Sequence, residues 1–115
     1  MKHAAALALA LVPGPALAAP VYLKCQLAPG AKGGAGGQDL AASAPMDITL
    51  NEDAGTVTYA FPTAARAYTV RGIFTAEQVT FNGFSVDRTN LAFQRSTFGV
   101  VDRGQCTLVE VKRAF

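Results

Sequence analysis

The sequence predicts an all-β fold: a small antiparallel meander of about seven or eight short strands, closed as a barrel or a sandwich. From residue 46 onward, apolar and polar residues alternate with period two, and clusters of Asn, Asp and Gly separate the alternating runs. No stretch of about twelve residues shows a helical period. The only two cysteines, Cys25 and Cys106, stand near opposite ends of the chain, so a disulfide between them would join the first strand to the last.

The chain begins with the features of a secretory signal peptide. Lys2 supplies the charge, an apolar run covers 4–12, helix breakers follow at 13–15, and 16–18 is an A-x-A cleavage site. The run is about nine residues long, whereas a membrane-spanning helix needs about twenty. We therefore expect a signal peptide at 1–18, cleavage near Ala18, and a single β domain at 19–115 that is periplasmic or extracellular. The Ala-rich signal suggests a bacterium.

The two cysteines are expected to form a structural disulfide. Thiols of small exported domains usually pair, and Cys25 has only Cys106 as an intramolecular partner. Redox motifs normally keep their cysteines close, as in C-x-x-C. Closing a loop of about 80 residues contributes roughly 4–5 kcal/mol in the chain-entropy description, a large share of the 5–15 kcal/mol typical of a domain.

The composition argues against several classes of function. The formal net charge of +2 falls to about +1 without Lys2, and no Lys/Arg run indicates nucleic acid. The single histidine, His3, lies in the signal segment, so the mature chain lacks Ser–His or Cys–His nucleophiles and ordinary zinc or copper sites. We expect no cofactor, no metal and no catalytic residue. The enzymatic alternative rests on carboxylates such as Glu52, Asp53, Asp87 and Asp102, all in turn-like contexts.

The first elements are a strand and a loop. Val21–Leu27 alternates as a strand does. The segment 28–45 is rich in Gly and Ala and has few large side chains, so it is expected to be a flexible loop. It is not a phosphate-binding loop, because Lys32 precedes the glycines and no helix pattern follows.

A hairpin and a further strand follow. Met46–Leu50 and Val57–Phe61 alternate around the turn former "NEDAG" at 51–55. Pro62 ends this hairpin, and Tyr68–Phe74 is expected to be one strand.

The second half repeats the pattern with shorter strands. After the turn "TAEQ", strands around Val79–Phe81 and Phe84–Val86 flank the turn pair Asn82-Gly83. Asp87 opens the turn "DRTN" by accepting backbone hydrogen bonds, with Asn90 as its left-handed residue.

The end of the chain is expected to reuse that hairpin solution. A strand starts at Leu91–Phe93, and "FGVVDRGQ" at 98–105 resembles the earlier phrase, which predicts a second Asp-Arg turn. The last strand is expected at Gln105–Lys112. Arg113 interrupts the apolar alternation that ends in Phe115, so we expect no membrane insertion.

The sequence favours a non-enzymatic exported binding or interaction module, expected to be a monomer, whose partner is an envelope or secreted protein. Exposed Tyr and Arg are residue types that interfaces favour. The candidate surface consists of Arg66, Tyr68, Arg71, Arg88 and Arg103. The alternative is a carrier of a small apolar ligand in a barrel cavity, since about eight short strands enclose room for side chains or one small ligand.

Three motifs support a resemblance. A Tyr-x-x-Cys stretch from Tyr22 to Cys25, "VDRTN" at 86–90 and "GQC" at 104–106 resemble small exported bacterial proteins of uncharacterised function. The stretch "AARAY" at 64–68 is loosely similar to the Ser-Gly-x-x-Tyr stretch of periplasmic C-type lysozyme inhibitors, with Arg66 and Tyr68 kept and the Ser and Gly replaced. The resemblance implies a disulfide-closed β-barrel and inhibition of a cell-wall hydrolase such as lysozyme.

Overall fold

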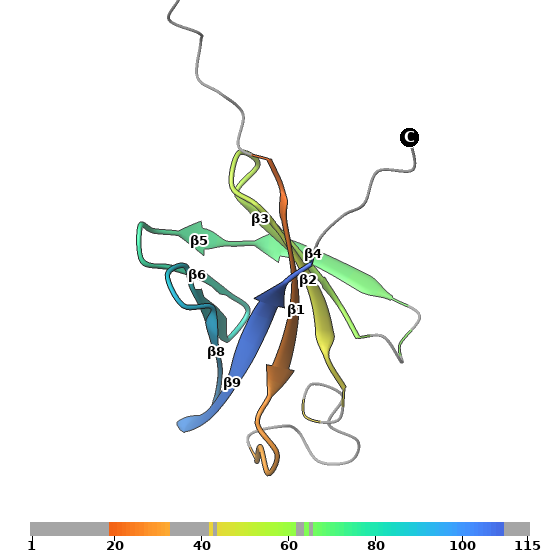
Figure 1. The fold of residues 1–115 in the computed structure, drawn as a ribbon, viewed down its shortest axis with the longest axis vertical. Helices are drawn as coiled ribbons and strands as arrows, with labels where there is room; N and C mark the ends of the chain where they lie inside the picture. The colour runs from red at the N-terminus through yellow and green to blue at the C-terminus, as the bar shows by residue number, and fades with distance from the viewer. Residues whose placement is uncertain (1–18, 33–41, 43, 62–63, 65, 110–115) are drawn as a thin grey trace, which may run out of the picture.

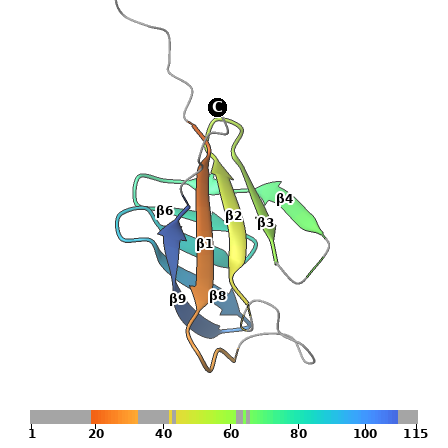
Figure 2. The same cartoon turned by 45° about the vertical axis from the view of Figure 1, so that its right-hand side comes forward.

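The strands of this protein form one antiparallel sheet in a nearly closed barrel (Figures 1 and 2). The computed structural model describes residues 19–32, 42, 44–61, 64 and 66–109. Within these residues the strands are β1 (Val21–Leu27), β2 (Met46–Asn51), β3 (Thr56–Ala60), β4 (Ala67–Arg71), β5 (Ile73–Phe74), β6 (Gln78–Phe81), β7 (Phe84–Asp87), β8 (Ala92–Thr97) and β9 (Val100–Leu108). The order across the sheet is β4-β3-β2-β1-β9-β8-β7-β6-β5. The prediction of an all-β meander is confirmed, and the closure is that of a barrel.

One bent segment brings the two edges of the sheet together. β4 and β5 lie at opposite ends of the strand order, yet only Gly72 separates them in the chain. β4 pairs with β3, whereas β5 pairs with β6. The prediction of one strand over Tyr68–Phe74 is therefore wrong, because the segment changes partners at Gly72. A Cβ on Gly72 would stand 2.8 Å from Cγ2 of Val57, which explains a glycine at this bend.

The first and last strands pair directly, as the cysteine positions predicted. β1 and β9 are antiparallel, and Cys25 lies opposite Cys106 in the register. A disulfide joins the two residues, and both are buried. Two positions along, Gly104 lies so close to β1 that a Cβ would collide with the carbonyl oxygen of Gln26. The pairing of β1 with β9 is thus held by a covalent bond and by tight backbone contact.

Alternation along the strands builds the core. In β1 the residues Leu23, Cys25 and Leu27 are buried while their neighbours are exposed. The rings of Phe84 and Phe93 stack with centroids 5.5 Å apart. The full buried cluster contains Leu23, Cys25, Leu27, Met46, Ile48, Leu50, Val57, Tyr59, Val79, Phe81, Phe84, Val86, Phe93 and Cys106. These side chains fill the middle of the barrel.

The turn between β7 and β8 confirms one prediction and corrects another. Oδ1 of Asp87 accepts hydrogen bonds from the backbone N–H groups of Thr89 (2.7 Å) and Asn90 (3.1 Å), as expected. The left-handed residue, however, is Leu91 at φ 62°, not Asn90. The side chain of Asn90 instead accepts a hydrogen bond from the N–H of Ala92, so it closes the turn without adopting the unusual backbone angle itself.

The second Asp-Arg phrase is not a turn. Asp102 and Arg103 lie inside β9, which begins at Val100 and ends at Leu108 rather than spanning Gln105–Lys112. The reversal occurs earlier, at Phe98 and Gly99, with φ values of 46° and 82°. This two-residue turn leaves room for β9 to pair with β8 from Val100 onward.

The predicted loop at 28–45 contributes to the core at its described ends. Ala31 packs against the core cluster and Ala44 is buried. The N–H of Ala28 donates to the carbonyl of Arg103 at 2.8 Å. Two alanines of this small-residue segment therefore contact the core or are buried. Positions 33–41 and 43, like the predicted signal peptide at 1–18 and positions 110–112 of the predicted last strand, lie outside the described residues.

Removing the disulfide is expected to lower the free energy of unfolding by roughly 4–5 kcal/mol, because the sequence separation of 81 makes the closed loop long. Urea unfolding of the oxidised protein, of the reduced protein and of a Cys25→Ala/Cys106→Ala variant measures this. The double variant controls for effects of the reductant. A loss below about 1 kcal/mol in both reduced and substituted forms would contradict the view that this bond holds β1 on β9.

Candidate functional site

The two ends of the barrel differ in how they are closed. Near the start of β9, Nη2 of Arg95 lies 2.8 Å from Oδ2 of Asp102, and both side chains are buried. The backbone N–H of Lys32 donates to Oδ1 of the same aspartate at 2.9 Å. A buried ion pair and the segment after β1 therefore occupy this end. At the other end, where β1 begins and β9 finishes, the barrel holds an open cavity of about 440 Å³.

The cavity has an aliphatic floor. Leu23, Leu50, Val79 and Val86 line it, and each is buried in the core. They come from β1, β2, β6 and β7, so the floor is the upper layer of the barrel core. Such a surface favours apolar groups because they would leave water on contact with it.

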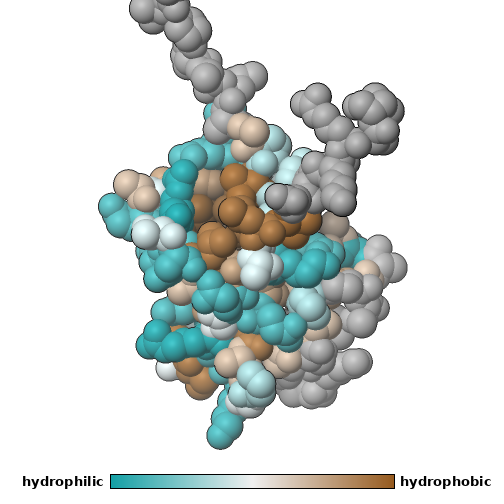
Figure 3. Space-filling model, in the orientation of Figure 1, coloured by the Kyte–Doolittle hydropathy of each residue, from teal (hydrophilic) through white to brown (hydrophobic). Residues whose placement is uncertain are grey.

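The rim of the cavity is also apolar. Val21 and Leu108 line it and keep 38% and 66% of their surface exposed. Figure 3 shows hydrophobic surface gathered around the upper end of the molecule, the end at which β1 begins. Exposed aliphatic side chains that continue a buried apolar surface are typical of a binding site.

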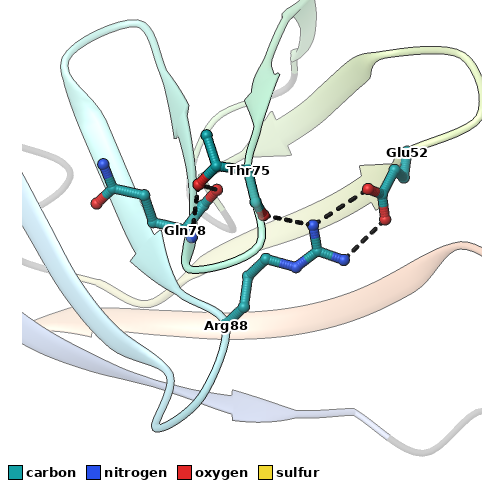
Figure 4. A network of polar contacts seen from close by, with 4 residues as sticks. All are labelled: Glu52, Thr75, Gln78 and Arg88. Atoms are coloured by element: carbon teal, nitrogen blue, oxygen red, sulfur yellow. Dashed lines mark hydrogen bonds and ion pairs between the residues drawn. The ribbon is translucent and has the colours of Figure 1, made fainter.

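One ion pair forms the polar wall of the cavity (Figure 4). Nη2 of Arg88 lies 2.7 Å from Oε1 of Glu52, and Nη1 lies 3.1 Å from Oε2, so the guanidinium contacts the carboxylate with both terminal nitrogens. Nη1 also donates to the carbonyl of Thr75 at 2.7 Å. The hydrogen bonds from Arg88 lower the pKa of Glu52, and the carboxylate raises the pKa of the guanidinium.

Three turns position this ion pair. Glu52 opens the turn between β2 and β3, where the side chain of Asn51 accepts a hydrogen bond from the N–H of Ala54. Arg88 follows Asp87 in the turn after β7. Its own N–H donates to the carbonyl of Glu77, which lies in the third turn, between β5 and β6. The contact of Arg88 with Glu52 thus links two parts of the barrel that are 36 residues apart in sequence.

The structure brings two of the predicted surface residues together. The guanidinium of Arg66 lies 5.6 Å from the ring centroid of Tyr68. Tyr68 stacks on Tyr59 with centroids 5.5 Å apart, and the Tyr59 hydroxyl accepts a hydrogen bond from Asn82 at 2.5 Å. This aromatic group lies on β3 and β4 and belongs to no part of the cavity lining.

The other three predicted residues are dispersed. Arg71 lines a shallow hollow on the outer surface beside Ile73. Arg88 stands on the cavity wall, and Arg103 lies toward the opposite end of the barrel, beside Pro29. The five residues therefore do not form one surface. Of the five, only Arg88 lines the cavity. The sequence did not predict the aliphatic lining, because alternation along a strand marks a residue as buried but does not show whether the end of the barrel above it is open.

Three of the four carboxylates considered for catalysis are engaged in other contacts, and the fourth, Asp53, is exposed. Glu52 and Asp102 each pair with an arginine, and Asp87 holds a turn. In the part of the chain that the structure describes, no group of three or more His, Cys, Asp or Glu side chains is placed to hold a metal ion. The same residues contain no helix of the length and apolarity needed to cross a bilayer.

Comparison with known proteins returns no relative. No known protein family, no characterised protein and no solved structure matches this chain. The function is therefore inferred from the geometry of the barrel.

The ion pair should make stability depend on pH. Arg88 lowers the folded-state pKa of Glu52 from its ordinary value of 4.5. Stabilisation by the pair is then fully present above that value and is lost as the pH falls through the lowered pKa. We expect Glu52→Gln to be less stable than the wild type at pH 7, by a small margin that disappears in acid, as measured by urea midpoints between pH 7 and pH 2.

Asp53→Asn is the matched control, since Asp53 lies in the same turn, is exposed and makes no ion pair with a described residue. A margin for Glu52→Gln that stays constant from pH 7 to pH 2 would show that the pair does not stabilise the fold.

Proposed function

We propose that this protein is a non-enzymatic binding module that takes a small, largely apolar ligand in the cavity at the open end of its barrel. The observation that carries the proposal is the cavity itself. Its volume of about 440 Å³ falls in the range of about 300–1,000 Å³ usual for small-molecule sites. An aliphatic floor, an exposed apolar rim and one polar wall are the composition that such sites have.

The ligand would lie at the end of the barrel rather than in its middle. The middle is filled by side chains, among them Phe84 and Phe93, whose rings stack at an interplanar angle of 1°. Phe93 is fully buried. This position also distinguishes the proposal from a carrier that encloses its cargo, because the site opens to solvent through Val21 and Leu108.

Two observations support a binding role in an oxidising compartment. The disulfide suits the periplasm or the exterior of the cell, and the sequence before Ala19 has the layout of a signal peptide. The absence of a histidine from the mature sequence and the pairing of Glu52 and Asp102 with arginines argue against carboxylate or histidine catalysis.

A protein partner is the second candidate. Phe98 stands at the tip of the β8–β9 hairpin, is fully exposed, and has a positive φ of 46°. A large side chain in this conformation costs on the order of 1–2 kcal/mol, and it contacts no core cluster in return. An exposed aromatic anchor of this kind fits a pocket on another protein. Inhibition of a cell-wall hydrolase through Arg66 and Tyr68 stays a prediction of the sequence resemblance.

The cavity is tested with a neutral apolar fluorophore, N-phenyl-1-naphthylamine. We expect saturable binding with a blue-shifted emission, because the probe would leave water for an aliphatic surface. Leu108→Trp should reduce this binding at least about tenfold by filling the rim, a loss of roughly 1.4 kcal/mol. Val101→Trp, which introduces the same large side chain at an exposed position of β9 away from the cavity, should leave it unchanged.

Absence of probe binding to the oxidised protein, or equal binding by both tryptophan variants, would overturn the cavity as the functional site. The partner candidate at Phe98 would then be favoured.

A further inference from the structure

We propose that the cavity ligand is an anionic amphiphile, namely an alkyl carboxylate whose headgroup takes the place of Glu52 on Arg88. The inference rests on the proposed function and specifies its ligand class. In the structure, the carboxylate of Glu52 contacts Arg88 at the position proposed for the headgroup, beside the apolar part of the cavity.

The geometry of Arg88 suits a carboxylate. Its two terminal nitrogens already contact two carboxylate oxygens, at 2.7 and 3.1 Å. The planar guanidinium fork matches this paired arrangement and favours carboxylates over single-point acceptors. A ligand carboxylate can therefore make the same two hydrogen bonds that Glu52 makes.

Arg88 is held in place independently of Glu52. Nη1 donates to the carbonyl of Thr75 at 2.7 Å, and the backbone N–H of Arg88 donates to the carbonyl of Glu77 at 2.8 Å. Thr75 is itself fixed by reciprocal hydrogen bonds with Gln78 (Figure 4). The guanidinium thus stays at the cavity wall when its carboxylate partner is exchanged.

The carboxylate of Glu52 can move away from Arg88 into solvent. Its side chain is 45% exposed and lies in an exposed turn. An ion pair with this exposure contributes little net free energy, and exchanging one carboxylate for another replaces like with like. Burial of an alkyl chain against Leu50, Val79 and Val86 supplies the difference in favour of the ligand.

The charged groups of the cavity lining add to this preference. Ala19 lines the same cavity as Arg88 and Glu52. Cleavage after Ala18, as the signal sequence predicts, would place a free α-ammonium group on Ala19. The cavity lining would then carry two positive groups against one carboxylate, an electrostatic bias toward an anion.

The test compares decanoate with decan-1-ol, which share a chain length and differ in headgroup charge. Displacement of N-phenyl-1-naphthylamine, with calorimetry as a direct measure, gives both affinities for the oxidised mature protein below the micellar concentration. We expect decanoate to bind at least about tenfold more tightly than decan-1-ol. Arg88→Gln should abolish this preference while the neutral probe still binds, and Arg88→Lys should keep only part of it.

The change in decanoate affinity caused by Glu52→Gln tests whether the ligand replaces this carboxylate. Removing the resident carboxylate should strengthen decanoate binding severalfold and decan-1-ol binding much less, because the anion competes with Glu52 for both hydrogen bonds of Arg88. Arg103→Gln, at an arginine beside Pro29 and away from the cavity, is the control and should change neither affinity.

Equal affinity for the acid and the alcohol, or weaker decanoate binding by Glu52→Gln, would overturn this inference while probe binding upheld the cavity. Failure of the probe and of both alkyl ligands to bind would overturn the proposed function itself.

Discussion

The fold depends on the pairing of β1 with β9. This ladder joins the first strand to the last. Without it, β1 and β9 would each become an open edge of the sheet. The Cys25–Cys106 bond makes the pairing covalent in the buried interior, and the missing side chain at Gly104 lets the backbones approach. The bend at Gly72 completes the circuit on the opposite side. Closure therefore rests on one cross-link and two glycines whose neighbours leave little room for a Cβ.

Closure leaves two ends that use arginine and a carboxylate differently. At one end Arg95 and Asp102 are buried opposite each other in the β8–β9 ladder, where separation would leave a buried charge unpaired. At the other end Arg88 and Glu52 form a partly exposed pair between turns, beside the apolar floor of the cavity. A buried pair closes its end, whereas an exposed pair can exchange partners at small cost. This difference in burial is the physical basis for placing the ligand site at the Arg88 end.

Alternation and turn chemistry predicted most of the fold. Val21–Leu27 is a strand with the predicted bounds, Asn82-Gly83 is the predicted turn with φ values of 45° and 84°, and the disulfide joins the predicted strands. The errors share a cause, since local patterns do not show which strand is the neighbour. The change of partner at Gly72 and the inward position of Asp102 both follow from pairing across the barrel. The cavity follows from the same pairing, since its lining is drawn from six strands and two turns that meet only in the closed barrel.

A binding site at the open end of the barrel that takes an anionic headgroup at Arg88 would respond to decanoate. Amide chemical shifts of the ¹⁵N-labelled oxidised protein, followed during titration with decanoate, measure that response. We expect saturable shifts at Glu52, Thr75, Arg88 and Thr89, with Gln26, Lys32 and Arg103 at the other end unchanged. Shifts centred on the Arg103 end or on the β8–β9 hairpin tip, or no saturable shift at any amide, would contradict this expectation.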